Sequence, residues 1–255
     1  MLVKDQLNRK IKVPGPVNRI VSLVPSQTEL LVDLGLKDRL VGITKFCVHP
    51  KDLREEIQVV GGTKSVHSEK IYDLQPDLII CNKEENTAAM VRELEDIAPV
   101  WVSDIVTIED SFEMIWLLGK VLGVVEIASE IIERITSEKK AFEKFMKDKP
   151  SKNVAYLIWK NPFMAAGPQT FIHSLLRLNN FRNIISEKRY PKVTVGELRW
   201  AELVLLSSEP YPFKEADVSE LKQKINADVQ LVDGEYFSWY GSRLQAAFEY
   251  FKSLH

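Results

Sequence analysis

Short apolar runs alternate with segments of helical periodicity in the first part of the chain. The apolar runs have the length and β-branched content of buried strands, and they cover residues 20–23, 40–43, 59–60, 78–81 and 100–102. Helical periodicity between them predicts helices over residues 29–34, 69–74 and 85–97. Strands that alternate with helices are typical of right-handed βαβ crossovers, so the pattern predicts a mostly parallel sheet covered by helices.

The first predicted strand passes into its helix through a polar turn. The apolar run ends before Pro25, and Ser26 and Glu29 have the spacing of a capping box. We therefore expect Ser26 to cap the following helix. In open α/β sheets such a turn lies at the carboxyl end of a strand, where ligands bind, so it indicates the functional face.

Residues 107–149 contain almost no strand signal and no proline. Apolar residues follow two helical stripes, and Gly123 marks a bend or a packing contact between them. The pattern predicts a helical connector, residues 106–150, between an N-terminal α/β lobe, residues 1–105, and a C-terminal α/β lobe, residues 151–255. Such a connector is stiff, so we expect two lobes at a nearly fixed separation, with a ligand cleft between them.

Alternation of apolar runs and helical segments resumes after the connector. It predicts strands over residues 154–159, 184–185, 203–206 and 229–232, and helices over residues 169–178 and 242–254. The second lobe is therefore predicted to be α/β as well.

Composition and motifs argue against several classes of function. A net charge of −2 over 255 residues gives no positive excess that would favour nucleic acid or an anionic membrane. Cys47 and Cys81 lie far apart and form no CxxC pattern, so no disulfide framework is expected. The chain contains no nucleophile elbow, Walker A loop, GxGxxG turn or HExxH motif, which argues against an enzyme.

The N-terminal residues lack the apolar core of a secretion signal. No run approaches the roughly 18 consecutive apolar residues of a membrane span. As written, the chain predicts a cytoplasmic protein. Removal of a leader upstream of Met1 would leave the same sequence in a periplasmic or cell-surface protein.

Six short motifs stand out in the first lobe, at residues 5–10, 19–23, 25–29, 61–62, 68–71 and 74–80. They resemble the class III periplasmic substrate-binding proteins of ABC importers, the helical-backbone group that binds cobalamin, ferric siderophores, haem or metal ions. The resemblance implies two Rossmann-like α/β lobes joined by a long helical backbone. It also implies a small metal chelate as ligand, no resident cofactor, a monomer that is not inserted into the membrane, and ABC permease subunits as partners. By motif position, Glu69 and Glu197 would dock into arginine pockets of the permease.

Two further stretches resemble the cobalamin-binding branch of this group. Residues 161–167 form a turn after the first strand of the second lobe, and residues 235–243 form an aromatic-rich loop. The resemblance implies a corrinoid as ligand, with haem or a ferric siderophore as alternatives. Where that branch has tryptophans, this chain has Thr63 or Lys64 and Asn82.

Two hypotheses from other functional classes remain open. A cytosolic enzyme or carrier that acts on the same chelate would account for the missing secretion signal. A receptor for a bare divalent metal would need several His and carboxylate ligands, and this chain has four histidines.

Polar and soft side chains follow the strands of the first lobe. Cys47 and His49 lie on one side of an extended segment and are soft and borderline metal ligands, so with Phe46 they form a candidate ligand contact or metal site. The alternative is a small buried cysteine beside a loop histidine. Lys64 and Lys83 are candidate partners for a carboxylate or phosphate of the ligand.

Aromatic residues gather in loops at predicted strand ends of the second lobe, where a planar or macrocyclic ligand would stack. These candidate ligand contacts are Trp159, Phe163, Tyr236, Phe237, Trp239 and Tyr240. Some of the rings are expected to be structural, since aromatic side chains are often core. Arg243 would meet an anionic ligand group or pair with a nearby carboxylate. Trp101, Trp116 and Trp200 lie in predicted strands or helices and are expected in the core.

Overall fold

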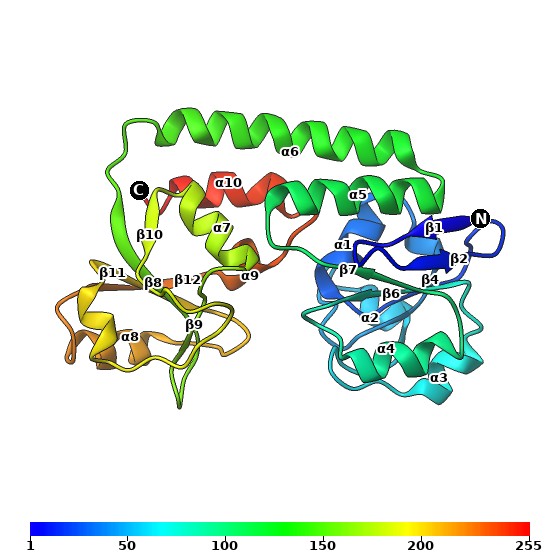
Figure 1. The fold of residues 1–255 in the computed structure, drawn as a ribbon, viewed down its shortest axis with the longest axis horizontal. Coiled ribbons are helices and arrows are strands. Elements are labelled where there is room, and N and C mark those ends of the chain that lie inside the picture. The colour runs from blue at the N-terminus through cyan, green and yellow to red at the C-terminus, as the bar shows by residue number, and fades with distance from the viewer. The chain divides into compact units, whose positions relative to one another are not determined.

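The computed structural model describes residues 1–255, drawn in Figure 1, and divides into two compact units. The first unit contains Met1–Asp104, Glu109–Ile135 and Tyr240–Arg243. The second unit contains Ile105–Ile108, Thr136–Trp239 and Leu244–His255. The region predicted as a separate connector is therefore shared between the two units, and a short segment near the C-terminus belongs to the first.

The first unit is built on a five-stranded sheet in the order β5-β4-β3-β6-β7. Its strands are β3 (Ile20–Ser22), β4 (Leu40–Ile43), β5 (Gln58–Val59), β6 (Leu78–Asn82) and β7 (Val100–Ser103). Every pairing is parallel, which confirms the predicted parallel sheet. Because β4 and β6 lie on opposite sides of β3, the order of the strands reverses there. The carboxyl ends beside such a switch point are where open α/β sheets bind ligands.

Short helices connect these strands: α1 (Pro25–Asp33), η1 (Lys37–Arg39), α2 (Leu53–Glu56), α3 (Ser68–Asp73) and α4 (Ala88–Glu95). The capping box predicted for α1 is wrong. The N-cap is Val24, which makes no side-chain hydrogen bond, and Pro25 begins the helix without an N–H that needs a partner. Ser26 is buried, and Glu29 pairs with Arg243 instead.

Helix α4 begins later than the predicted residue 85. Thr87 is its N-cap and accepts the backbone N–H of Met90 at 3.2 Å. Ahead of it, Asn82 Oδ1 accepts the N–H groups of Glu84 and Glu85 at 2.7 and 3.1 Å. These bonds hold both glutamates in a turn before the helix, at the carboxyl end of β6.

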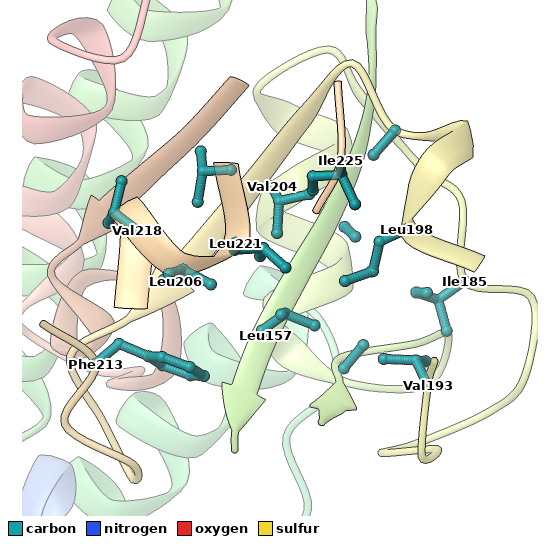
Figure 2. Packing of buried hydrophobic residues seen from close by; sticks show 14 residues of the cluster. Leu157, Ile185, Val193, Leu198, Val204, Leu206, Phe213, Val218, Leu221 and Ile225 are labelled. Carbon is teal, nitrogen blue, oxygen red and sulfur yellow. The ribbon is translucent and has the colours of Figure 1, made fainter. Parts of the chain in front are cut away.

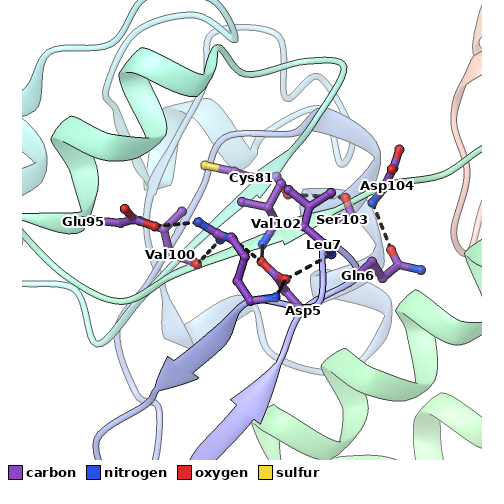
Figure 3. A network of polar contacts seen from close by, with 10 residues as sticks. Asp5, Gln6, Leu7, Cys81, Glu95, Val100, Val102, Ser103 and Asp104 are labelled. Carbon is purple, nitrogen blue, oxygen red and sulfur yellow. Dashed lines mark hydrogen bonds and ion pairs between the residues drawn. The ribbon is translucent and has the colours of Figure 1, made fainter.

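The opening motif of the chain joins a small hairpin, β1 (Leu2–Lys4) and β2 (Lys10–Lys12), to this sheet. Asp5 is buried, and its carboxylate accepts two N–H groups of its own turn and the N–H of Val102 (Figure 3). It also pairs with Arg9 Nε at 2.7 Å. A single carboxylate therefore ties the hairpin to β7, and this gives the motif at residues 5–10 a physical role.

Two long helices, α5 (Ile108–Leu122) and α6 (Val125–Met146), form the predicted helical region. The chain breaks between them at Gly123, whose φ of +75° is a left-handed conformation that glycine adopts most easily. Gly119 lets the helices pack closely, because a Cβ there would lie 2.5 Å from Ala128 Cβ. The predicted bend is thus at Gly123, and Gly119 makes the close contact.

The second unit contains a parallel path of strands in the order β10-β8-β11-β12, with β9 antiparallel to β8. Its strands are β8 (Lys152–Trp159), β9 (Met164–Ala165), β10 (Phe181–Asn183), β11 (Leu203–Ser207) and β12 (Asp228–Val232). Its helices are α7 (Phe171–Leu178), η2 (Glu197–Trp200), α8 (Glu215–Lys222), α9 (Gly234–Ser238) and α10 (Leu244–Lys252). Figure 2 shows part of its core, in which Leu157 and Leu206 pack with Leu221 and other buried side chains.

Several elements of this unit differ from the prediction. The short elements β9, η2 and α9 were not predicted, and α9 forms the first part of the expected aromatic-rich loop. The strand predicted over residues 184–185 is β10, which ends at Asn183. The side chain of Asn183 accepts the N–H of Ile185 at 3.1 Å, so that N–H is used in a local turn. Helix α8 was not predicted, because Val218 and Leu221 are its only buried residues and leave little periodicity.

The tryptophans expected in the core behave differently from one another. Trp101 is fully buried in β7, which confirms its prediction. Trp116 is 43% exposed on α5, where Lys120 Nζ lies 4.9 Å from its ring centroid, and Trp200 is 80% exposed at the end of η2. The core predictions for these two residues are wrong, because their helical segments bury a different face.

Candidate ligand-binding site

Four buried polar side chains meet at the carboxyl ends of β3, β6 and β7 in the first unit, and we call them the switch-point cluster. They are Gln27, Asn82, Ser103 and Tyr240. The amide nitrogen of Gln27 donates to Ser103 Oγ and lies 3.4 Å from Tyr240 Oη. Asn82 Nδ2 donates to Ser103 Oγ at 3.0 Å. The bonds therefore connect three strand ends to a segment from the far end of the chain.

Gln27 carries the one unsatisfied atom of this cluster. Its side chain is fully buried, yet its Oε1 has no hydrogen-bond partner. A buried acceptor without a partner costs about 1–3 kcal/mol. This oxygen is thus an unsatisfied acceptor inside the cluster, with no surface exposed to solvent.

A carboxylate lies beside the cluster. Burial raises the pKa of Glu85, while Lys64 and a hydrogen bond from Thr63 act in the opposite direction. Burial also raises the pKa of Tyr240, and the charge of Glu85 adds to that effect. Glu85 and Tyr240 therefore lie close enough for the carboxylate to affect the phenol, which stays protonated at neutral pH.

Both candidate lysines already contact protein groups. Lys64 Nζ donates to the carbonyl of Glu84, and Lys83 Nζ pairs with Asp104 at 2.5 Å. That Lys64 and Lys83 bind a carboxylate or phosphate of the ligand stays a prediction.

Arg243 forms a bidentate ion pair with Glu29. Its Nε and Nη2 lie 2.9 and 2.6 Å from the two carboxylate oxygens, and both side chains are mostly buried. Burial raises the pKa of Glu29, although Arg243 and, more weakly, His49 act to lower it. A carboxylate at the start of the last helix was one of the two partners predicted for Arg243, but the carboxylate that it meets is Glu29 of α1.

The segment after β4 separates its three candidate residues. Cys47 is fully buried, and its Sγ lies 3.2 Å from Thr28 Oγ1 and 3.3 Å from Thr44 Oγ1. Burial raises the pKa of this thiol, which keeps it protonated. Phe46, in contrast, is 49% exposed, and His49 lies near enough to Glu29 to affect its pKa. Metal binding by Cys47 and His49 stays a prediction.

In the second unit, two aromatic candidates lie at the carboxyl end of β8. Trp159 is the last residue of this strand and is 42% exposed, with its ring edge-on to Tyr211 at 5.6 Å. Phe163, in the following turn, packs partly buried against the core of the unit. Trp159 therefore presents the larger free surface of the two.

The remaining aromatic candidates are more enclosed. Trp239 is 7% exposed, and its indole N–H donates to Glu209 at 3.0 Å. Tyr236 stacks on Tyr250 with ring centroids 4.6 Å apart, and Phe237 is fully buried. Phe237 is thus a core residue, whereas ligand contact by Tyr236, Trp239 and Tyr240 stays a prediction.

The two candidate docking glutamates are both exposed. Glu69 lies in the first turn of α3. Glu197 lies in η2 and accepts the backbone N–H and the hydroxyl of Thr194 at 2.6 and 2.7 Å, bonds that lower its pKa. Both side chains are therefore accessible to a partner.

Sequence reasoning missed Gln27 and Ser103 as candidate site residues. A usable signal exists, since Ser103 ends an apolar strand and Gln27 follows another within a few residues. No group of three or more His, Cys, Asp or Glu side chains is arranged to hold a metal ion. None of the helices combines the length and hydropathy that crossing a bilayer requires.

Comparison with known proteins places this geometry in context. Residues 20–203 match the family model described as periplasmic binding protein. An ABC transporter substrate-binding lipoprotein of Bacillus subtilis, YvrC, is 25% identical over 194 residues, which cover 73% of this chain and 61% of YvrC. The match thus spans less than two thirds of that relative.

Two solved structures share the fold. The periplasmic vitamin B12 binding protein of Vibrio cholerae has a TM-score of 0.81 at 19% identity, covering 94% of this chain and 97% of that one. The periplasmic heme-binding protein RhuT of Roseiflexus sp. RS-1 has a TM-score of 0.80 at 15% identity, covering 94% and 98%. The predicted fold class, two α/β lobes with a long helical backbone, is therefore confirmed.

Proposed function

Because the chain belongs to the periplasmic binding protein family, we propose that it captures a metal-containing small molecule for an ABC importer. We take a corrinoid as the first ligand class, with haem and ferric siderophores next. The two structures named above, one for vitamin B12 and one for heme, support these classes but do not choose between them. The enzyme alternative loses its support, because this family consists of binding proteins.

One observation carries the proposal: a large aromatic ring is exposed at a strand carboxyl end in each unit. Phe46 follows β4 and is 49% exposed, and Trp159 ends β8 and is 42% exposed. Because about half of each side chain is already buried, the exposed part forgoes roughly 1 kcal/mol of burial. Stacking on a macrocycle would recover part of that energy.

Polar groups would orient such a ligand. In the first unit, the exposed candidates for this role are Lys64 and Lys83, which already contact the carbonyl of Glu84 and the carboxylate of Asp104. Gln27 Oε1 has no partner, but it is fully buried and a ligand does not reach it in this arrangement. The prediction that the ligand lies in a cleft between the lobes stays a prediction.

Ligand identity is tested by titrating the purified chain with cobalamin, haem and a ferric siderophore, followed by absorbance and tryptophan fluorescence. We expect saturable binding of cobalamin, weakened about tenfold by Phe46→Ala or Trp159→Ala, because each loses one stacking face. Trp116→Ala is the matched control, since this ring is exposed on α5, away from the strand ends. Saturation by haem alone, or by a bare divalent metal alone, would replace the corrinoid in the proposal.

The same relatives support a proposal for the place of action. The matched relative is a lipoprotein, and the solved structures are periplasmic proteins. We therefore propose that the chain works outside the cytoplasmic membrane, with Glu69 and Glu197 as its contacts to the permease.

A further inference from the structure

A basic hollow of about 470 Å³ lies beside the edge strand β10 of the second unit. Its polar lining residues are Ser151, His173, Arg177, Asn180, Arg182 and Asn183. Ser151 precedes β8 and Asn180 precedes β10, so the hollow begins at the amino ends of these strands. It is thus separate from the candidate ligand contacts, which follow the carboxyl ends.

Some of the lining groups already have partners and form the walls. Ser151 Oγ donates to the carbonyl of Asn180 at 2.9 Å. Asn180 Nδ2 donates to the carbonyls of Met146 and Lys149 at 3.0 and 3.2 Å. These bonds fix the shape of the hollow and leave both side chains little capacity for a ligand.

Asn183 determines which nitrogen of His173 carries the proton. Its Oδ1 accepts the N–H of Ile185, and its Nδ2 donates to the carbonyl of Ala166 at 2.7 Å and lies 3.2 Å from His173 Nδ1. Nδ1 must therefore accept, so the neutral imidazole keeps its hydrogen on Nε2. Burial and the charge of Arg177 lower the pKa of His173, which favours this neutral form.

The guanidinium groups of the two arginines of the hollow have no ion-pair or hydrogen-bond partner. Each has a structural explanation by itself. Arg177 lies in the last turn of α7, where a cation is favoured, and Arg182 lies on an edge strand, where charge discourages pairing with other chains. Neither explanation requires both guanidinium groups to line one hollow that has no carboxylate among its lining residues.

We propose that this hollow binds the phosphate group of a small solute. Arg177 and Arg182 would each present a fork of N–H donors to the phosphate oxygens, and His173 Nε2–H would add a neutral donor. The hollow is wide open to solvent and both arginines are exposed, so it has room for more than the phosphate alone. The site does not depend on the identity of the transported ligand.

Calorimetric titration of the purified chain with inorganic phosphate and with a sugar phosphate, at constant ionic strength, tests the proposal. We expect saturable binding that Arg177→Gln and Arg182→Gln each weaken about tenfold, since each removes a charge-assisted pair. Arg92→Gln, which changes an exposed arginine of α4, is the matched control and should bind like the unchanged chain.

Pelleting with phosphatidylglycerol vesicles separates a free phosphate from a lipid headgroup. Binding to vesicles that requires both arginines, without binding of soluble phosphates, would overturn the proposal in favour of a membrane contact. Absence of phosphate binding, or equal affinity in all the variants, would overturn it outright.

Discussion

At the scale of single residues, the ion pair between Glu29 and Arg243 is the contact most sensitive to change. The two side chains are 18% and 11% exposed, so removing one partner leaves a poorly solvated charge. We expect Arg243→Met to lower the free energy of unfolding by about 3 kcal/mol. Denaturant unfolding without ligand measures this.

The double variant with Glu29→Leu supplies the control for this pair. If the charge left behind causes the loss, the double variant is more stable than Arg243→Met alone. A double variant that is less stable than either single one would assign the loss to packing of the arginine side chain.

His255 predicts a pH dependence of stability. Burial, with Lys152 and Lys149, lowers its pKa from 6.5 to about 4, and its ring stacks on Phe181. The folded chain therefore binds this proton less readily than the unfolded chain. Its contribution to stability is complete above pH 6.5 and is lost as the pH falls toward 4.

Because the His255 ring is partly solvated, we expect the loss to be about 1 kcal/mol. The denaturant midpoint is measured across this pH range. It should depend less on pH in His255→Gln than in the unchanged chain. Parallel slopes in the two chains would assign the pH dependence to other groups.

The partners of single side chains are what the sequence predicts least well. Arg243 was predicted to meet a carboxylate or a ligand, but its partner lies 214 residues away in the chain. Likewise, the burial of Cys47 between two threonine hydroxyls depends on how β4 meets α1. Such partners depend on tertiary packing, which a local pattern does not contain.

At the scale of elements, the sequence predicts strands better than short helices. Buried parallel strands such as β6 and β11 are continuous apolar runs, which stand out in any composition. Helix α8 buries two residues and was missed, and the capping box of α1 failed because Pro25 begins the helix without a side-chain cap. A prediction from local sequence fails where a side chain such as Glu29 binds a partner that is distant in the chain.

The break between α5 and α6 gives a prediction at this scale. A Cβ on Gly123 would meet no atom within 4 Å, so its φ of +75° is the only obstacle to a larger residue. We expect Gly123→Ala to destabilise the chain by about 1 kcal/mol, measured by urea unfolding. Gly15→Ala is the control, because Gly15 is also uncrowded and has no positive φ, and it should leave stability unchanged or slightly raised.

At the scale of the whole molecule, the proposed function requires contact with a permease. We expect Glu69→Lys combined with Glu197→Lys to abolish co-purification with the cognate permease, because like charges would then meet at the proposed arginine pockets. Ligand affinity should not change, since neither residue is among the ligand candidates. Glu133→Lys, an exposed change on α6, is the control. Unchanged co-purification of the double variant would show that these glutamates do not dock.

The segment Tyr240–Arg243 also affects how the chain is made. The first unit takes all its other residues from positions up to Ile135, yet it needs this segment for bonds to Gln27, Glu29 and Ser111. A ribosome adds roughly 5–20 residues per second, so these groups wait several seconds for their partners during synthesis. N-terminal domains usually finish folding first. Here the first unit completes its polar contacts only after residues 240–243 have been synthesised.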